Sequence, residues 1–144
     1  MILRPTTFTD EKLLLDWRND PTVLAVSANT LAVSAESHKA WLFNVMRDTE
    51  TQLYIAEIDD GIPIGQGRIE RAWKAISRKM DCCLIGYSIA YEYRGQGHGA
   101  ELVHALVHCA RLLGYHAVSC RIKRTNTRSI AVAVKAGIDT IQFF

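Results

Sequence analysis

The sequence lacks the features that mark a membrane, secreted or metal-centred protein. No apolar run approaches the roughly 20 residues of a membrane-spanning helix, and no basic start precedes an apolar signal region. The four cysteines form no Cys-x-x-Cys motif, and Cys82 and Cys83 are adjacent, so a strand would direct them to opposite faces. We therefore expect a cytoplasmic protein with reduced thiols, no membrane partner and no metal site.

Proline is also scarce, and charge is moderate. Three prolines, 49% hydrophobic residues and 22% charged residues describe an ordinary folded chain rather than a disordered one. No internal repeat or low-complexity linker divides the sequence. At 144 residues, we expect a single domain over residues 1–144, large enough to bury a substantial core.

Acidic residues are rare in the second part of the chain. Residues 61–144 hold twelve Lys and Arg against five Asp and Glu, whereas residues 1–60 hold five against ten. A basic segment suits a polyanion, either nucleic acid or a multiply phosphorylated cofactor, although it can also be a solvated surface. No aromatic interleaving accompanies the charge, so we expect no nucleic-acid partner. We expect the acidic first part to border a site for a cationic amine.

Apolar periodicity and turn residues predict alternating strands and helices. Predicted strands are Ile2–Arg4, Leu53–Ile58, Ile62–Ile69, Asp81–Ala90, Ala117–Ile122 and Ile138–Phe143, and predicted helices are one capped by Thr9 or Asp10, a turn at Thr22–Val26, one capped by Ser34, Ala100–Leu113 and Thr127–Ala136. Residues 71–79 are expected to form an exposed connection. The helix after Ser34 is expected to pack Trp41 and Leu42 into the core, with His38 at its rim. The order β-α-α-β-β-β-α-β-α-β predicts an α/β domain with a mixed sheet.

Three alternating glycines, Gly95, Gly97 and Gly99, lie where the central strand gives way to the next helix. Because glycine has no Cβ to hold a ligand away, free amides and the positive end of the helix dipole can cradle an anion there, and pyrophosphate fits best. The alternative is a tight turn that only permits close packing. The spacing matches neither a dinucleotide fingerprint nor a Walker loop. The following helix has an apolar stripe, which comprises Leu102, Val103, Leu106, Val107 and Ala110.

The string Arg94-Gly95-Gln96-Gly97-His98-Gly99 fits the pattern Arg/Gln-x-x-Gly-x-Gly/Ala and resembles the GNAT superfamily of acyl-CoA N-acyltransferases. The element order matches the GNAT fold, a mixed central sheet flanked by helices, over almost the whole chain. The resemblance implies acetyl-CoA as co-substrate, with the loop amides at its pyrophosphate and Ile89 and Asn126 along its pantetheine arm. The implied cofactor-binding residues are Ile89, Ala90, Arg94, Gly95, Gln96, Gly97, His98, Gly99, Ala100, Asn126 and Ser129.

The end of the chain departs from the GNAT pattern. Family members often have a tyrosine general acid where this chain has Ala133, and Gly137 corresponds to the glycine that ends their last helix. They usually finish with a hairpin of two strands, whereas this chain has only the strand Ile138–Phe143, so the hairpin is shortened. Since an open strand edge promotes association, we expect that strand to be covered, either by insertion between other strands or by a second subunit in a homodimer.

The groups that would transfer protons are not obvious. The family's glutamate base aligns with Cys83 or Leu84, and neither accepts a proton well near neutral pH. Glu70, at the end of the preceding strand, is our first candidate for the base, although a surface carboxylate balancing an arginine is an equal alternative. Tyr87 and Ser88 are the candidates to protonate the departing thiolate.

The first third of the chain carries a second resemblance. Leu13-Leu14-Leu15-Asp16-Trp17-Arg18-Asn19-Asp20-Pro21, His38-Lys39-Ala40-Trp41-Leu42 and Gly65-Gln66-Gly67-Arg68 are similar to GNAT enzymes that acetylate nucleotide-linked amino sugars, of the pseudaminic acid type. The tryptophan-containing helix also occurs in relatives that act on ribosomal-protein amino termini. A diphosphate-bearing acceptor needs donors, for which the candidates are Arg18, Asn19, Arg68 and Arg71.

Two hypotheses from different classes follow. The first is an N-acetyltransferase that moves the acetyl group of acetyl-CoA to a primary amine by direct attack. Its small-molecule acceptor is expected to be a nucleotide-linked amino sugar, with peptide amino termini or a small polyamine as alternatives. The second is a catalytically inactive CoA-binding sensor or partner protein. We favour the enzyme because direct attack by a neutral amine needs mainly positioning and an oxyanion donor, and we expect a slow rate that rises with pH until the amine is neutral.

Overall fold

The computed structural model describes residues 1–72 and 81–144. The strands are β1 Ile2–Pro5, β2 Thr51–Ile58, β3 Ile62–Arg71, β4 Cys82–Ile89, β5 Ala117–Ile122 and β6 Thr140–Phe143. The helices are α1 Glu11–Arg18, α2 Pro21–Val26, α3 Ala35–Arg47, α4 His98–Leu112 and α5 Thr127–Lys135, with 3-10 turns at Phe8–Asp10 and Tyr91–Tyr93. The predicted α/β order is confirmed. An exposed connection was predicted for residues 71–79, and residues 73–79 of it lie outside the described residues.

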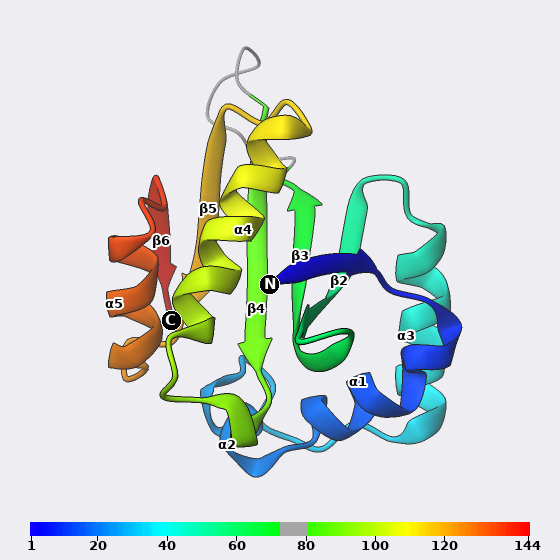
Figure 1. Ribbon diagram of the computed structural model, residues 1–144. Helices are drawn as coiled ribbons and strands as arrows, with labels where there is room; N and C mark the ends of the chain where they lie inside the picture. The colour runs from blue at the N-terminus through cyan, green and yellow to red at the C-terminus, as the bar shows by residue number, and fades with distance from the viewer. Residues whose placement is uncertain (73–80) are drawn as a thin grey trace.

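The six strands form one sheet in the order β1-β2-β3-β4-β5-β6 (Figure 1). The pairs from β1 to β4 are antiparallel, while β4–β5 and β5–β6 are parallel. A parallel pair needs a crossover, and α4 and α5 provide the two crossovers. The sheet is therefore mixed, as the sequence predicts. The hairpin between β2 and β3 turns at Asp59, Asp60 and Gly61, which all have positive φ.

Helices cover both faces of the sheet. Tyr54 of β2 and Ile69 of β3 belong to the cluster packed by α4, whereas the neighbouring Leu53 and Ile55 pack with Leu14 and Leu42 of α1 and α3. Successive residues of a strand point to opposite faces, so α4 lies on one face and α1 and α3 lie on the other. In Figure 1, α4 crosses in front of β4, α5 lies beside it, and α2 lies below the carboxyl end of β4.

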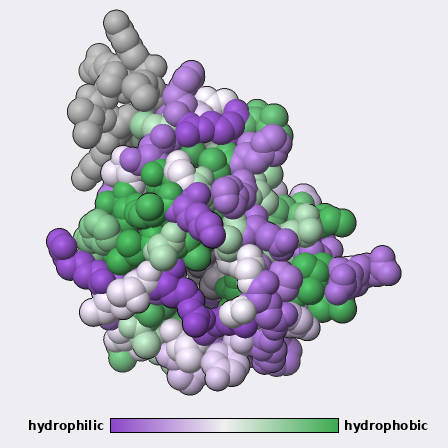
Figure 2. All heavy atoms as spheres, turned by 60° about the vertical axis from the view of Figure 1, so that its left-hand side comes forward, coloured by the Kyte–Doolittle hydropathy of each residue, from purple (hydrophilic) through white to green (hydrophobic). Residues whose placement is uncertain are grey.

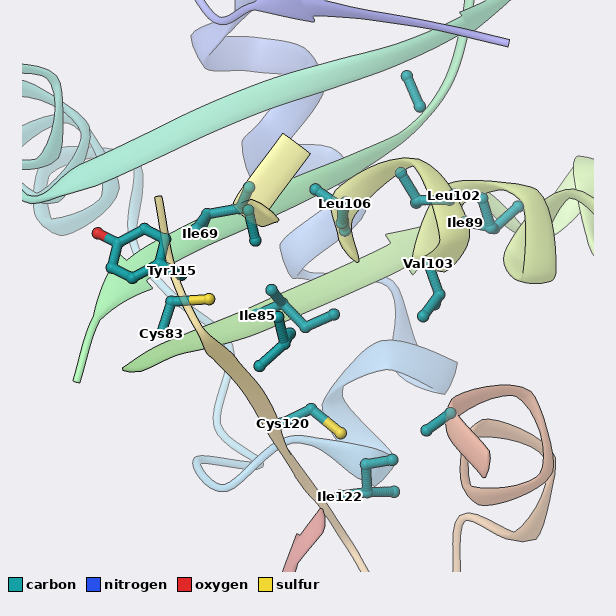
Figure 3. Close-up of a cluster of buried hydrophobic side chains, with 14 of the residues drawn as sticks. Ile69, Cys83, Ile85, Ile89, Leu102, Val103, Leu106, Tyr115, Cys120 and Ile122 are labelled. Carbon is teal, nitrogen blue, oxygen red and sulfur yellow. The ribbon is translucent and has the colours of Figure 1, made fainter. Parts of the chain in front are cut away.

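The main core lies under α4. Leu102, Val103 and Leu106 have no exposed surface, which confirms the predicted stripe. Figure 3 shows these side chains facing the sheet residues of the same cluster. Burying each such side chain contributes about 1.5–3 kcal/mol. Gly67 of β3 allows the helix to approach, because a Cβ there would lie 2.7 Å from Cδ2 of Leu106.

A smaller core joins α3 to β2. Ser34 caps α3 as predicted, since its hydroxyl accepts a hydrogen bond from the Ser37 amide at 3.1 Å. Leu42 is buried as predicted. The prediction for its two neighbours was wrong: His38 is only 3% exposed, while Trp41 is 37% exposed. The helix is rotated so that His38, not Trp41, faces inward.

The last strand lies at the edge of the sheet. Among the described strands, β6 pairs only with β5, from Ser119↔Thr140 to Ile122↔Phe143, so its predicted insertion between other strands is wrong. The strand is also shorter than predicted, because Asp139 turns back to β5. Its amide donates to the Val118 carbonyl at 3.0 Å, and its carboxylate accepts from the Val118 amide at 2.7 Å. Whether a second subunit covers β6 stays a prediction.

The described residues include no helix long and apolar enough to cross a membrane. Within residues 1–72 and 81–144 there is also no group of three or more metal-ligating His, Cys, Asp or Glu side chains. No disulfide joins the four cysteines, which all lie in the described part of the chain.

Candidate active site

β4 and β5 part at their carboxyl ends. They pair only from Cys82↔Ala117 to Ile85↔Cys120, and Gly86–Ile89 have no partner on β5. A cavity of about 1000 Å³ opens at this gap and extends beneath α1, α2 and α3. Figure 2 turns the α5 side forward and shows hydrophilic side chains around a hollow in the lower half of that face.

The amino terminus of α4 forms one wall of the cavity. The first intrahelical bond runs from the Glu101 amide to the Gly97 carbonyl at 3.3 Å, so the three preceding amides have no helical partner. Gly95 and Gly97 have φ of +74° and +87°, and a Cβ at Gly95, Gly97 or Gly99 would meet no described atom within 4 Å. The glycines therefore keep this surface open rather than allow close packing. Unpaired amides at the positive end of a helix dipole suit a phosphate.

The free edge of β4 forms the next wall. The Ala90 amide donates to the Ile64 carbonyl at 2.8 Å, and Gly65↔Ile89 is the neighbouring pair. Because hydrogen-bonded and non-bonded pairs alternate in an antiparallel ladder, the backbone groups of Tyr87 and Ile89 point away from β3, into the gap. These backbone groups can therefore form hydrogen bonds with an extended ligand that carries amides, in the way that one strand pairs with another.

Most residues predicted to bind the cofactor line this cavity. Those that line it are Ile89, Arg94, Gly95, Gly97, Gly99, Ala100, Asn126 and Ser129. The other three are not among the described residues that line it. The Ala90 amide donates to Ile64 of β3, the Gln96 side chain donates to the Glu92 carbonyl, and the His98 ring forms a hydrogen bond with Glu101. Asn126 also caps α5, because its Oδ1 accepts from the Ser129 amide at 3.3 Å.

Two cations tie the cofactor side of the cavity to α2. Arg94 donates from Nε to the Ile89 carbonyl at 2.8 Å and from Nη1 to the Thr22 hydroxyl at 2.5 Å. Lys123, in the loop before α5, donates to the Ala25 carbonyl at 3.1 Å. Arg94 thus connects the end of β4 to α2 at the cavity, and with Lys123 it holds α2 over the carboxyl end of β4.

Two of the four predicted substrate residues reach the cavity. Arg18 and Arg68 line it, and Nη1 of Arg18 and Nε of Arg68 are enclosed without a hydrogen-bond partner among the described residues. Asn19 instead fixes the chain before α3, since its amide exchanges two hydrogen bonds with the Val33 backbone at 2.8 and 2.7 Å. Arg71 lies at the other end of β3, paired with Glu50 at 2.5 Å and Asp81 at 2.8 Å.

The charge lining the cavity is positive. Six cations contribute to it, namely Arg18, Arg68, Arg94, Arg121, Lys123 and Arg128, and no Asp or Glu is among the described residues that line it. The first part of the chain does border the cavity through α1, α2 and α3, but none of its acidic residues is among the described lining. Acids of that part are paired elsewhere: Asp10 and Glu57 bind Arg4, and Asp20 caps α2 through the Thr22 amide at 2.8 Å.

The three catalytic candidates are separated. Tyr87 and Ser88 line the cavity where β4 leaves β5. Glu70 pairs with Leu84 near the start of β4, away from the gap, and its Oε1 lies 3.6 Å from Nη2 of Arg68. The structure does not bring Glu70 into the described lining. Burial raises the pKa of Tyr87 to about 12, so this hydroxyl keeps its proton at neutral pH.

Several lining residues were missed by sequence reasoning. The basic residues Arg121, Lys123 and Arg128 were noticed only as part of a charge excess. They lie at the end of β5, in the loop after it and in the first turn of α5, and ligands commonly bind beyond the carboxyl ends of such strands. His38 was assigned to the rim of a core helix, yet it lies in the cavity wall.

Comparison with known proteins gives a family match. The model of the acetyltransferase (GNAT) domain family matches residues 1–139. No curated protein matches the chain.

Solved structures share the fold. Ribosomal-protein-alanine N-acetyltransferase from Brucella melitensis has a TM-score of 0.76 at 24% identity, over 95% of this chain and 83% of that chain. Spermidine N-acetyltransferase from Vibrio cholerae, in complex with CoA and spermine, has a TM-score of 0.80 at 16% identity, over 94% and 79%. Aminoglycoside acetyltransferase AAC(6')-Ib in complex with ribostamycin and coenzyme A has a TM-score of 0.82 at 24% identity, over 94% of this chain and 80% of that chain. At these identities the likeness shows the fold alone.

Proposed function

Because this chain belongs to the GNAT acetyltransferase domain family, we propose that it transfers the acetyl group of acetyl-CoA to the primary amine of a nucleotide-linked amino sugar. One observation carries the proposal. A single cavity joins the open amino terminus of α4 to two arginines that have enclosed, unpartnered nitrogens, Arg18 and Arg68. The first feature fits the pyrophosphate of coenzyme A, and the second fits a negatively charged acceptor.

Acetyl-CoA supplies an acetyl group already activated as a thioester. Amides at the start of α4 would hold its pyrophosphate, and the basic residues around the β5–α5 loop would neutralise its phosphates. Backbone groups of Tyr87 and Ile89 would pair with the pantetheine amides, while Asn126 offers its Nδ2 on the opposite side of the gap. This fit leaves the acceptor the part of the cavity beneath α1 and α3.

The acceptor pocket favours an anion over a polycation. Arg18 and Arg68 contribute positive charge to the pocket. The described lining contains no carboxylate, and the carboxylate of Glu70 lies outside it, 3.6 Å from Arg68. Arg68 lies against Gly86 of β4, since a Cβ at Gly86 would be 3.5 Å from Nη2. This position sets its guanidinium beside the gap, where a diphosphate can accept charge-assisted hydrogen bonds. Spermidine and aminoglycosides would meet repulsion here. A peptide amino terminus is the remaining alternative.

Direct attack by the amine requires few groups. A neutral amine nitrogen attacks the thioester carbonyl, and a β4 amide facing the gap stabilises the negative charge that develops on its oxygen. Tyr87 or Ser88 protonates the departing thiolate. Tyr87 suits this role because it remains protonated at neutral pH. The family's tyrosine is absent at Ala133, and Tyr87 approaches the same helix from β4, as its hydroxyl donates to the Ser129 carbonyl at 3.2 Å.

The test is thiol release from acetyl-CoA with an acceptor panel. The panel contains nucleotide-linked amino sugars, peptides with free amino termini, and spermidine. We expect turnover of the sugars and none of spermidine. Arg68→Gln should raise the KM for the sugar about 10- to 100-fold, the equivalent of one charged hydrogen bond. Arg47→Gln, an exposed arginine on α3 outside the described lining, is the matched control.

Each other outcome has a distinct meaning. Turnover of peptides but of no sugar would replace the acceptor and keep the enzyme. Binding of coenzyme A with no thiol release for any amine would favour the inactive CoA-binding protein. Preferred turnover of spermidine would contradict the electrostatic argument from Arg18 and Arg68.

A further inference from the structure

His38 is a buried titratable side chain in the wall of the acceptor part of the cavity. It is 3% exposed and projects from α3, and its ring lies 5.3 Å from that of Trp41 at a tilt of 41°. Its Nδ1 is enclosed and has no hydrogen-bond partner among the described residues, whereas Nε2 is not among the enclosed unpartnered atoms. A core histidine normally satisfies its ring nitrogens, so an unmade bond here indicates a missing ligand or water.

Burial favours the neutral form of His38. Burial lowers the pKa of His38, and Arg18 on α1 lowers it further, while Glu11 on the same helix opposes the shift. Arg68 of β3 also lines this cavity. An imidazole with a pKa below its ordinary value is unprotonated near pH 7 and has a free lone pair on one nitrogen.

Other groups in the described lining cannot accept a proton near neutral pH. No carboxylate is present there, and Tyr87 titrates near 12. Glu70 is ion-paired with Arg68 outside the lining. Cys83, one of the two positions that align with the family's glutamate, is completely buried, and burial raises its pKa to about 11. An incoming ammonium group therefore finds one suitable base among the described lining residues.

We infer that His38 is the general base that deprotonates the acceptor ammonium, an inference that rests on the proposed function. One ammonium proton passes to the lone-pair nitrogen of His38 and then to solvent. The freed lone pair of the amine forms the C–N bond to the acetyl carbon as the C–S bond breaks. The second amine proton ends on the coenzyme A sulfur through Tyr87 or Ser88, which gives the amide and the free thiol.

The proposal assigns a different pH profile to the enzyme with and without His38. With the base, kcat/KM falls only below the lowered pKa of His38 and is level from about pH 7 to the pKa of the acceptor amine. Without it, the rate follows the fraction of free amine and rises tenfold per pH unit. His38→Gln should therefore lose about 100-fold in kcat/KM at pH 7, and the loss should shrink as the pH approaches the amine pKa.

The experiment compares the parent, His38→Gln and a control. The control is His104→Gln, which alters an exposed histidine on α4 outside the described lining and should leave the profile unchanged. Calorimetric binding of coenzyme A should be the same in all three, because His38 lies on the acceptor side. NMR titration of the parent gives a second readout that needs no turnover, and the pKa of His38 should lie below the ordinary histidine value of about 6.5.

The outcomes separate the two proposals. An active parent with the same pH profile as His38→Gln overturns the role of His38 and leaves the proposed function intact. If His38→Gln does not fold, the titration decides, and a His38 that is protonated at pH 7 overturns the inference. A parent that binds coenzyme A and acetylates no acceptor overturns the proposed function and the role of His38 with it.

Discussion

The Tyr87 hydroxyl donates a hydrogen bond to the Ser129 backbone carbonyl at 3.2 Å, across the gap between β4 and α5. A phenol has one proton, so this proton is held by Ser129 in the absence of a bound thiolate. Rotation about the bond between the ring and the oxygen would redirect it into the gap. Burial keeps the proton in place, since it raises the pKa of Tyr87 to about 12.

Tyr87→Phe tests this proton donor. The variant should lower kcat about 100-fold, within the usual range for general acid catalysis, and leave the KM for acetyl-CoA unchanged. Loss of the bond to Ser129 should also cost about 1 kcal/mol of unfolding free energy. Tyr54→Phe removes a hydroxyl from a partly buried tyrosine outside the described lining and should keep full activity. An unchanged kcat in Tyr87→Phe would assign the proton to Ser88 or solvent.

Gly99→Val tests the phosphate cradle at α4. Gly97→Val would also fill the cradle, but Gly97 has φ +87°, so a side chain there strains the backbone whether or not a ligand binds. Gly99 lacks this conflict, and its Cβ would meet no described atom. The Gly99→Val variant should fold and weaken coenzyme A binding by at least about 1.4 kcal/mol, a tenfold change measured by calorimetry. Ala131→Val, on the exposed side of α5, is the control. Parent-like affinity would place the pyrophosphate elsewhere.

Local sequence patterns predicted the fold because each element depends on nearby residues. β5 begins and ends where predicted, at Ala117 and Ile122, since a short alternating run lies between turn residues. Gly137 ends α5 with φ of +77°, in agreement with the glycine expected there from the resemblance. The extra residues of β2 and β3 could not be predicted, because Thr51 and Arg71 join strands only through pairing with distant partners.

The site depended on contacts between distant segments, so only part of it could be predicted. The glycine loop is a local motif, and Gly97 and Gly99 line the cavity as expected. Asn19 and Arg71 carry suitable donors, but Val33 and Glu50 occupy them, and no local pattern identifies these partners. His38 was misplaced for a related reason, because a small rotation of α3 decides which residue faces inward.

Gly65→Ala tests how tightly β3 must approach β4 beside the gap. A Cβ at Gly65 would lie 2.4 Å from the Ser88 carbonyl oxygen, which is backbone and cannot rotate away. The strands would have to shift, at a cost of about 1–3 kcal/mol of unfolding free energy. Gly86→Ala is the matched control in the paired strand, because its Cβ would meet Arg68 at an ordinary 3.5 Å. Urea unfolding should separate the two variants, and equal stabilities would contradict the argument.

The last prediction concerns the ion pairs that anchor β1. Arg4 donates to Asp10 at 2.7 Å and to Glu57 at 2.8 Å, and Asp10 also accepts from the Thr7 amide at 2.9 Å. The hydrogen bond from Arg4 lowers the pKa of Asp10 below its ordinary value. A carboxyl with a lowered folded-state pKa stabilises the protein above its unfolded-state pKa, about 3.9, and that contribution is lost as the pH falls through the folded-state pKa.

Asp10→Asn should therefore lower the unfolding free energy at pH 7 by about 1.5–3 kcal/mol, the range for hydrogen bonds to a charged group. The difference from the parent should shrink as the pH falls below about 3.9, because the unfolded parent then binds a proton at Asp10 that the folded parent does not. Asp16→Asn removes a carboxylate from an exposed pair with Lys12 and should change stability by at most about 0.5 kcal/mol. Urea titrations at pH 7 and pH 3 measure both variants. A difference between Asp10→Asn and the parent that is equal at the two pH values would show that packing around Asp10, not its charge, holds β1 in place.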